Sequence, residues 1–269
     1  SVEGITFNAT ESSKLTGLLF RGDKPNDGYD LDITVSDCVF NGWSFGVGVY
    51  SHANGYDLTV SSCTFDSVCA VNFNFDDSTV GQIANNTLTF SGENAVNGEF
   101  AVQKYNNSTP ISFNEYYETI ADFENGNGIA GDAVKFVANE TALKNAVTAE
   151  GAYIVLTDDI EVSSKITVNE NITIDGSGHT IKASDSWSGT ENTDKQLLGI
   201  EGSAAANAVV KNITLDSNSR AYGFQPYDVD GTVYLCNVIL KNSKGTGMTV
   251  NGSSVVADNL TVSGSGWGQ

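Results

Sequence analysis

The sequence predicts an all-β fold: a right-handed parallel β-helix (a solenoid) with one short amphipathic capping helix near residues 139–151. Three observations predict it. A short motif recurs along the chain, its copies often lie 22–25 residues apart, and turn-forming residues follow each copy. In this motif a small or polar residue precedes an apolar residue, any residue, a second apolar residue and a polar turn.

Each copy has the period-two alternation of a β-strand, which places its two apolar side chains on one face. Thr, Val, Ile and Phe dominate the copies, and these residues suit a pleated sheet. Because equivalent residues of stacked coils lie about 4.8 Å apart, the first apolar residue of each copy is expected in an interior ladder. The ladder residues are Ile5, Cys38, Cys63, Leu88, Ile172, Ile213, Val238 and Leu260.

The length of the repeat selects a β-helix among the repeat folds. From Cys38 to Cys63 and from Cys63 to Leu88 the spacing is 25 residues (63 − 38 and 88 − 63). A second apolar run follows most copies, so one repeat holds at least two short strands and two turns. A propeller blade needs roughly 40 residues and a leucine-rich repeat needs a leucine-dense consensus, and neither fits.

One segment breaks the strand pattern and indicates a helix. Asn139 can cap its amino end and Gly151 can end it. Three apolar residues fall on one helical face: Leu143, Ala146 and Val147. The sequence therefore predicts a capping helix in mid-chain.

The predicted organisation has three parts: coils without an amino-terminal cap (1–112), a connecting segment (113–138) and capped coils (139–269). The connecting segment fits a flexible linker or a packed excursion. An uncovered β-helix end offers unpaired backbone groups to another strand. Two explanations therefore stay open: the chain is a segment of a longer protein, or its ends join head to tail between subunits.

The segment Glu140–Ala183 resembles the amino-terminal entry of the pectin-lyase-like right-handed parallel β-helix superfamily, including its bacterial or archaeal surface and adhesin-type members. The resemblance implies that the helix covers the open end of a coil stack and that ordinary rungs follow to Gln269. The resemblance is specific for fold and unspecific for function, since the superfamily includes lyases, hydrolases, esterases and non-enzymatic adhesins.

The charge balance limits the partners. Asp and Glu number 33 against 13 Lys and Arg, a formal net charge of −20. Such a surface repels nucleic acid and anionic lipid, and no apolar run is long enough to insert into a membrane. We expect an extracellular or cell-surface protein with no cofactor, apart from loosely bound calcium.

The residues that the resemblance would make catalytic are missing. Pectate lyases of the superfamily use an arginine as the catalytic base. This chain has two arginines, and neither lies in an Arg-x-Pro-x-x-Arg motif. The pairs Asp76-Asp77 and Asp158-Asp159 stand alone, and adjacent strand residues point to opposite faces. They are interpreted as solvated turns, as are the segments around His52 and His179.

One residue is a candidate for carbohydrate binding, and another is a candidate for glycosylation. Trp187 lies in a predicted turn and could stack on a sugar ring, whereas Trp43 and Trp267 are expected to pack. Asn107 is the preferred glycosylation candidate among several Asn-x-Ser/Thr sequons. No metal site is expected, and Cys38 and Cys63 are interpreted as small core residues whose parallel side chains suit a disulfide poorly.

These observations predict a non-enzymatic extracellular structural scaffold: a surface fibre, filament subunit or adhesin stalk. Its expected partners are copies of itself or adjoining repeats of a longer chain, with glycans as a further candidate. Two alternatives stay open. One is a polysaccharide lyase or hydrolase of the same superfamily, which a carboxylate-lined groove would favour. The other is a carbohydrate-binding module, which coplanar exposed aromatic side chains would favour.

Overall fold

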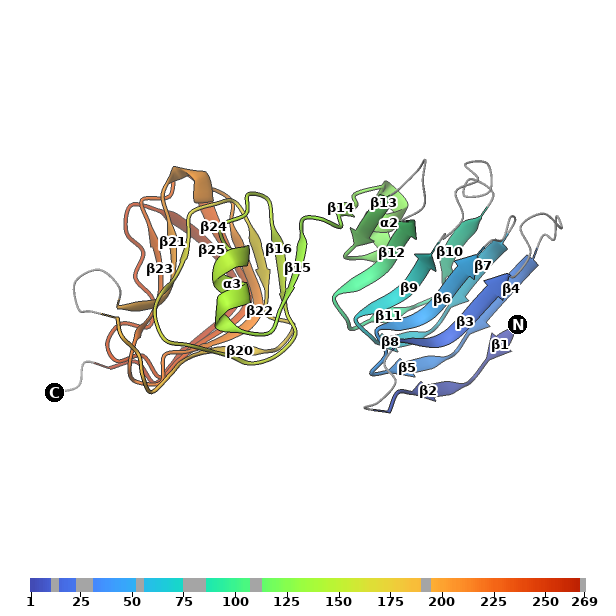
Figure 1. The fold of residues 1–269 in the computed structure, drawn as a ribbon, viewed down its shortest axis with the longest axis horizontal. Coiled ribbons are helices and arrows are strands. Elements are labelled where there is room, and N and C mark those ends of the chain that lie inside the picture. The colour runs from blue at the N-terminus through green and yellow to red at the C-terminus, as the bar shows by residue number, and fades with distance from the viewer. Residues whose placement is uncertain are drawn as a thin grey trace. The chain divides into compact units, whose positions relative to one another are not determined.

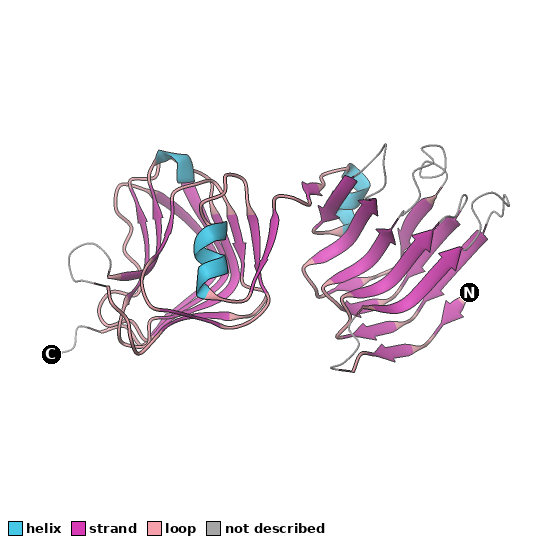
Figure 2. Ribbon diagram, viewed as in Figure 1, coloured by secondary structure: helices cyan, strands magenta, loops and turns pink. Residues whose placement is uncertain are grey.

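The computed structural model describes residues 1–10, 15–22, 31–51, 56–74, 86–106, 113–189 and 195–266. Two compact units divide the chain, Ser1–Asp132 and Ala133–Gln269, and each consists mainly of stacked parallel strands (Figures 1 and 2). The prediction of an all-β parallel β-helix is therefore confirmed. Five residues discussed above lie outside the described residues: His52, Asp76, Asp77, Asn107 and Trp267.

The first unit is a stack of four coils, each with three strands. The first coil contains β1 (Val2–Glu3), β2 (Thr6–Asn8) and β3 (Thr16–Gly22), and the second contains β4 (Leu31–Ser36), β5 (Val39–Asn41) and β6 (Phe45–Ser51). The third contains β7 (Tyr56–Ser61), β8 (Thr64–Asp66) and β9 (Cys69–Asn74), and the fourth β10 (Thr87–Ser91), β11 (Ala95–Val96) and β12 (Phe100–Asn106). Strands of successive coils pair in parallel, which gives three sheets.

An aromatic stack runs through the core of this unit. Phe7, Phe40 and Phe65 pair in register on β2, β5 and β8. Their ring centroids lie 4.8 and 5.0 Å apart, with interplanar angles of 1° and 4°. The strand spacing of about 4.8 Å imposes this face-to-face arrangement, because identical residues occupy one position in three coils.

The predicted ladder fails at Leu88. Val39 donates to the Ile5 carbonyl and Thr64 to the Cys38 carbonyl, so Ile5, Cys38 and Cys63 share one column as predicted. Cys38 and Cys63 are interior, but Ile5 is 46% exposed. Leu88 instead pairs with Leu58 on the preceding sheet, and Asn94 follows Cys63, to which its side chain is hydrogen-bonded. The third coil is longer than the second, since Cys63 and Asn94 are 31 residues apart whereas Cys38 and Cys63 are 25 apart. Counting 25 residues on from Cys63 therefore reaches β10, the strand that precedes the column continued by Asn94.

The carboxyl end of the first stack is covered by its own chain. Strand β13 (Phe113–Tyr117) pairs antiparallel with β12, and β14 (Ile129–Ala130) pairs antiparallel with β13. Between them lies helix α2 (Ile120–Asn125), whose Phe123 ring meets Phe90 and Tyr117 edge-on. Burial and the hydrogen bond to Glu115 raise the pKa of Tyr117 to about 12.

This arrangement corrects the predicted connecting segment 113–138. Residues up to Asp132 belong to the first unit, whereas β15 (Val134–Val137) pairs with the second. Helix α2 was not predicted from the sequence. Its signal is the capping box between Thr119 and Asp122, in which each side chain bonds the other residue's backbone N–H.

The second unit is a coil stack that begins with a helical cap. Its strands after β15 are β16 (Tyr153–Leu156), β17 (Ile160–Val162), β18 (Ile166–Val168), β19 (Thr173–Asp175), β20 (Thr180–Ala183), β21 (Gln196–Glu201), β22 (Val209–Asp216), β23 (Tyr222–Tyr227), β24 (Thr232–Lys241) and β25 (Ser254–Ser263). All pairs among them are parallel. A 3-10 turn, η1 (Ser203–Ala205), precedes β22.

The predicted capping helix is present as α3 (Glu140–Ala146), with Asn139 as its amino-terminal cap. The apolar face enters the core of the unit: Leu143, Ala146 and Val147 are buried there. The Glu140 carboxylate accepts hydrogen bonds from the Ser163 backbone (2.9 Å) and from Lys144 Nζ (2.6 Å). These bonds join the helix to the turn after β17.

In the second unit, three of the four residues predicted for the ladder share one column. Ile213, Val238 and Leu260 pair in register on β22, β24 and β25. Ile172 instead lies one position before Thr173, which pairs with Val209. The column below Ile213 is occupied by Gly176, where an added Cβ would come within 2.5 Å of the Ile213 Cβ. Ile172 therefore lies beside Ala208 and not in the column of Ile213.

Candidate functional site

A ladder of asparagines forms one corner of the second coil stack. Asn212, Asn237 and Asn259 all have left-handed backbones, with φ of 51°, 54° and 53°. Asn259 donates to the Asn237 side-chain oxygen (2.9 Å), Asn237 to Asn212 (3.0 Å) and Asn212 to Asp175 (3.2 Å). Asn tolerates this backbone region better than most residues, so the motif's Asn is explained by the corner.

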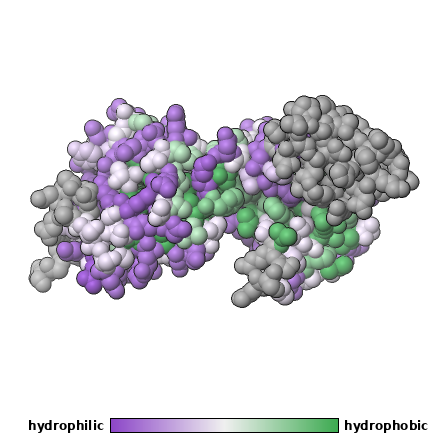
Figure 3. All heavy atoms as spheres, in the orientation of Figure 1, coloured by the Kyte–Doolittle hydropathy of each residue, from purple (hydrophilic) through white to green (hydrophobic). Residues whose placement is uncertain are grey.

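The outer surface of the same unit carries alternating charges. Glu161, Lys182, Asp216 and Lys241 occupy paired positions on four successive strands. Lys182 contacts Glu161 at 2.9 Å and Lys241 contacts Asp216 at 3.5 Å. Burial alone would raise the pKa of Asp216, but hydrogen bonds from Asn242 and Asn218 and the Lys241 charge lower it. Figure 3 shows hydrophilic side chains over much of the visible face of this unit.

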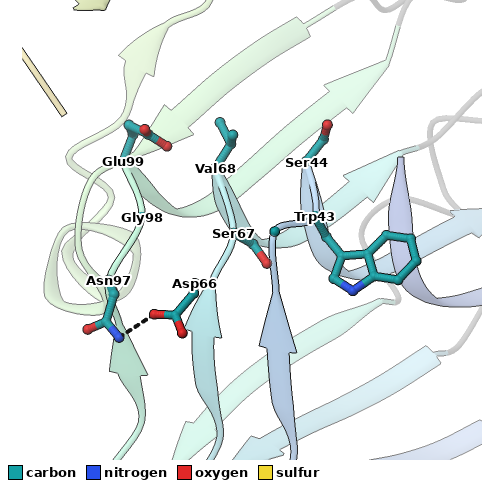
Figure 4. A pocket seen from close by; sticks show the side chains of 9 residues that line it. Trp43, Ser44, Asp66, Ser67, Val68, Asn97, Gly98 and Glu99 are labelled. Atoms are coloured by element: carbon teal, nitrogen blue, oxygen red, sulfur yellow. Dashed lines mark hydrogen bonds between the residues drawn. The ribbon is translucent and has the colours of Figure 1, made fainter. Parts of the chain in front are cut away.

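An open depression of about 320 Å³ lies on the first unit, where the coils turn from the second to the third sheet (Figure 4). Its lining comes from three successive coils: Gly42, Trp43, Ser44, Asp66, Ser67, Val68, Asn97, Gly98 and Glu99. Two carboxyl groups are present, and the Asp66 carboxylate accepts a hydrogen bond from Asn97 at 2.7 Å. Carboxylates near an open depression match one feature expected for the enzymatic alternative.

The contacts in the depression stabilise coil stacking. The Trp43 indole donates to the Phe7 carbonyl (3.1 Å) and packs against the core of the unit. The buried Ser67 hydroxyl points to the Phe40 carbonyl at 3.5 Å. At Gly98 an added Cβ would lie 1.6 Å from the Ser67 carbonyl oxygen, so the backbones of two coils touch there. Each of these groups joins neighbouring coils.

Trp187, the predicted sugar-stacking residue, lies against the core of the second unit. Its ring is half-buried and packs against the core of the second unit, and its Nε1 atom is buried. Among the described residues this nitrogen has no hydrogen-bond partner. An aromatic face that stacks on sugar must be open to solvent, and packing against the core covers part of this ring.

The turn prediction for Asp158-Asp159 and His179 agrees with their contacts. Asp158 accepts from the Asp159 backbone, and Asp159 accepts from the Thr180 backbone at 2.8 Å. The His179 Nδ1 lies 3.5 Å from Asp159. These side chains order two neighbouring turns.

All four cysteines are free: Cys38, Cys63 and Cys69 are buried, and Cys236 is half-buried. Burial raises the pKa of both Cys63 and Cys69. The thiolate is the reactive form of cysteine. These two thiols should therefore react slowly with solvent reagents, because burial shields the sulfur atoms and the raised pKa keeps them protonated.

The sequon asparagines differ in whether their side chains are already hydrogen-bonded in the structure. Asn212 and Asn259 use their amide nitrogens in the corner ladder, and Asn139 caps helix α3. Asn171 is exposed on the second unit. A glycan on either ladder residue would therefore break a bond between coils.

Among the described residues, no group of three or more His, Cys, Asp or Glu side chains is arranged to hold a metal ion. No helix in this part of the chain is long and apolar enough to cross a bilayer.

Stacked parallel coils, a helix at the amino end and asparagine corners define the second unit as a pectin-lyase-like parallel β-helix. Residues 134–266 match the family model described as "Putative pectate lyase-like adhesive domain". The match begins in β15 and extends past β25, so it covers the described coils of this unit. Searches of curated proteins and of solved structures return no match.

Proposed function

We propose that the chain is a non-enzymatic, cell-surface scaffold of the adhesin type. The observation that carries the proposal is the match of residues 134–266, the stacked coils of the second unit, to an adhesive-domain family. Fold alone does not give function, so the polar side chains provide the second argument. The asparagine ladder and the alternating charges bond coil to coil, as a load-bearing stalk requires.

The experiment compares adhesion with cleavage. Beads coated with the chain are passed over immobilised polysaccharides and over epithelial cells, and retention is measured against beads coated with the heat-denatured chain. The same polysaccharides are incubated with the soluble chain and assayed for new reducing ends and unsaturated uronic acids. Retention without cleavage is the expected result.

A variant in the depression around Asp66 tests the enzymatic alternative. If cleavage occurs and is lost in Asp66→Asn, the scaffold proposal is wrong and the depression is an active site. Retention by purified glycans alone, with no retention by cells, would favour the carbohydrate-binding module.

A further inference from the structure

A lysine and an aspartate meet at a buried site between two coils of the second unit. Asp175 on β19 and Lys211 on β22 occupy paired positions on neighbouring parallel strands. Lys211 Nζ lies 3.4 Å from Asp175 Oδ2, and the two side chains are only 12% and 5% exposed. The outer pair of Lys182 and Glu161 is 41% and 63% exposed. Taking both members of an ion pair out of water is costly, so the buried pair calls for an explanation that the outer pair does not.

The two oxygens of the Asp175 carboxyl group have different partners. Oδ1 accepts hydrogen bonds from the Ser177 backbone N–H (2.9 Å) and from the Asn212 side-chain amide (3.2 Å). Oδ2 accepts from the Tyr153 hydroxyl (3.3 Å), and it is also the oxygen beside Lys211. Two N–H donors on one oxygen stabilise the negative charge that develops there when a nucleophile adds to the carboxyl carbon. A hydroxyl on the other oxygen can supply the proton that this oxygen needs to leave.

The surroundings of the pair exclude water and fix its geometry. Tyr153 is 6% exposed, and Lys211 Nζ lies 5.1 Å from the centre of its ring. Val155, the partner of Asp175 on β16, is fully buried. At Gly176 an added Cβ would lie 2.6 Å from a carbonyl oxygen of the next coil, so the two coils touch directly beside the pair. The amine and the carboxyl group are therefore held together and shielded from solvent.

We propose that these two side chains react to form an intramolecular isopeptide bond between Lys211 Nζ and Asp175 Cγ. One proton passes from the ammonium to the carboxylate, and the neutral amine then attacks Cγ. Negative charge moves to Oδ1, where the two N–H donors hold it, and Oδ2 leaves as water with the Tyr153 hydroxyl as proton relay. The C–N bond forms and the Cγ–Oδ2 bond breaks. Of the three ammonium protons, one stays on the amide nitrogen and two leave in the water, so no other reactant is needed.

Proximity favours this condensation. Well-oriented intramolecular reactions reach effective molarities of about 10⁵–10⁸ M, because the two groups no longer have to meet by diffusion. Burial acts in the same direction, since it penalises the two charged reactants and not the neutral amide. The product joins two successive coils covalently. This inference goes beyond the proposed scaffold function and does not depend on it.

The test is the intact mass of the full chain in denaturant. A chain with the bond should be lighter than its sequence by the mass of one water molecule. Protease digestion should release a branched peptide that joins the segments around Asp175 and Lys211. Lys211→Arg should restore the full mass. Lys182→Arg is the matched control and should keep the deficit, because Lys182 contacts an exposed carboxylate.

Two further variants test the chemistry of the step. Asp175→Asn should give the same branched peptide with ammonia as the leaving group, which an ordinary ion pair cannot do. Tyr153→Phe keeps the ring and removes the proton relay, so bond formation should slow by about 100-fold or more. The rate is measured as the unlinked fraction of a pulse-labelled sample over time.

A parent chain with the full sequence mass would overturn the proposal, and a variant that fails to fold does not obscure that result. A mass deficit without the branched peptide would overturn it as well. Asp175 would then have lost water by cyclising onto the backbone nitrogen of Gly176, which leaves Lys211 unmodified. Either result would leave the scaffold function untouched, because adhesion is measured independently.

Discussion

Replacing Phe40 tests the aromatic stack and the independence of the two units. Phe40 is fully buried between the rings of Phe7 and Phe65. Truncating a buried Phe to Ala costs ~3–5 kcal/mol. Each lost ring contact adds about 0.5 kcal/mol, the low end for aromatic pairs, because the face-to-face geometry is not the preferred one. The sum is about 4–6 kcal/mol for the first unit.

The assay is urea unfolding of single-tryptophan variants, since Trp43 lies in the first unit and Trp187 in the second. With a slope of about 2 kcal/mol per M urea, Phe40→Ala should lower the midpoint reported by Trp43 by about 2–3 M. The midpoint reported by Trp187 should stay unchanged. Phe40→Leu keeps most of the volume and should cost only ~1–2 kcal/mol.

A shift below about 0.5 M at Trp43, roughly 1 kcal/mol with the same slope, would refute the reasoning about the stack. Equal shifts at both tryptophans would refute the independence of the units.

Three further predictions concern the second unit and the thiols. Glu140→Gln should cost about 1–2 kcal/mol at neutral pH, because the carboxylate bonds Ser163 and Lys144. Burial alone would raise the pKa of Glu140, but these bonds lower it, so the stability is present above the ordinary carboxyl pKa and lost as the pH falls through the folded one. Asn237→Ala should cost about 2–3 kcal/mol, from left-handed strain and two ladder bonds. A maleimide should label only Cys236 in the native chain.

Each of these has a control. Unfolding curves of parent and Glu140→Gln between pH 3 and pH 7 should converge at the acid end, and a constant gap would contradict the linkage. Asn171→Ala removes an exposed Asn from the same unit and should stay within ~0.5 kcal/mol of the parent. Mass spectrometry of labelled peptides should find four modified cysteines only in denaturant, and early labelling of Cys63 would contradict its burial.

Local patterns predicted the elements whose cause is local. The alternation of Gly4–Phe7 and its copies gave the coil strands, and Asn139 with Leu143 gave helix α3. Helix α2 has a comparable local signal in Thr119 and Asp122, but its six residues are too few for an apolar period. The candidate site was less well predicted from the sequence than the fold. Asn107 lies outside the described residues, Trp187 packs against the core, and the depression around Asp66 was not predicted.

The sequence by itself determined the fold class, the capping helix and the residue types at the corners, because strand alternation, helix capping and left-handed tolerance act within a few residues. Only the tertiary structure decided which copies of the motif share a column. Leu88 and Ile172 left their predicted ladders because register depends on the total length of each coil, including its turns. It also decided that residues 113–132 cover the first stack, since pairing of β13 with β12 is a contact that no local pattern encodes.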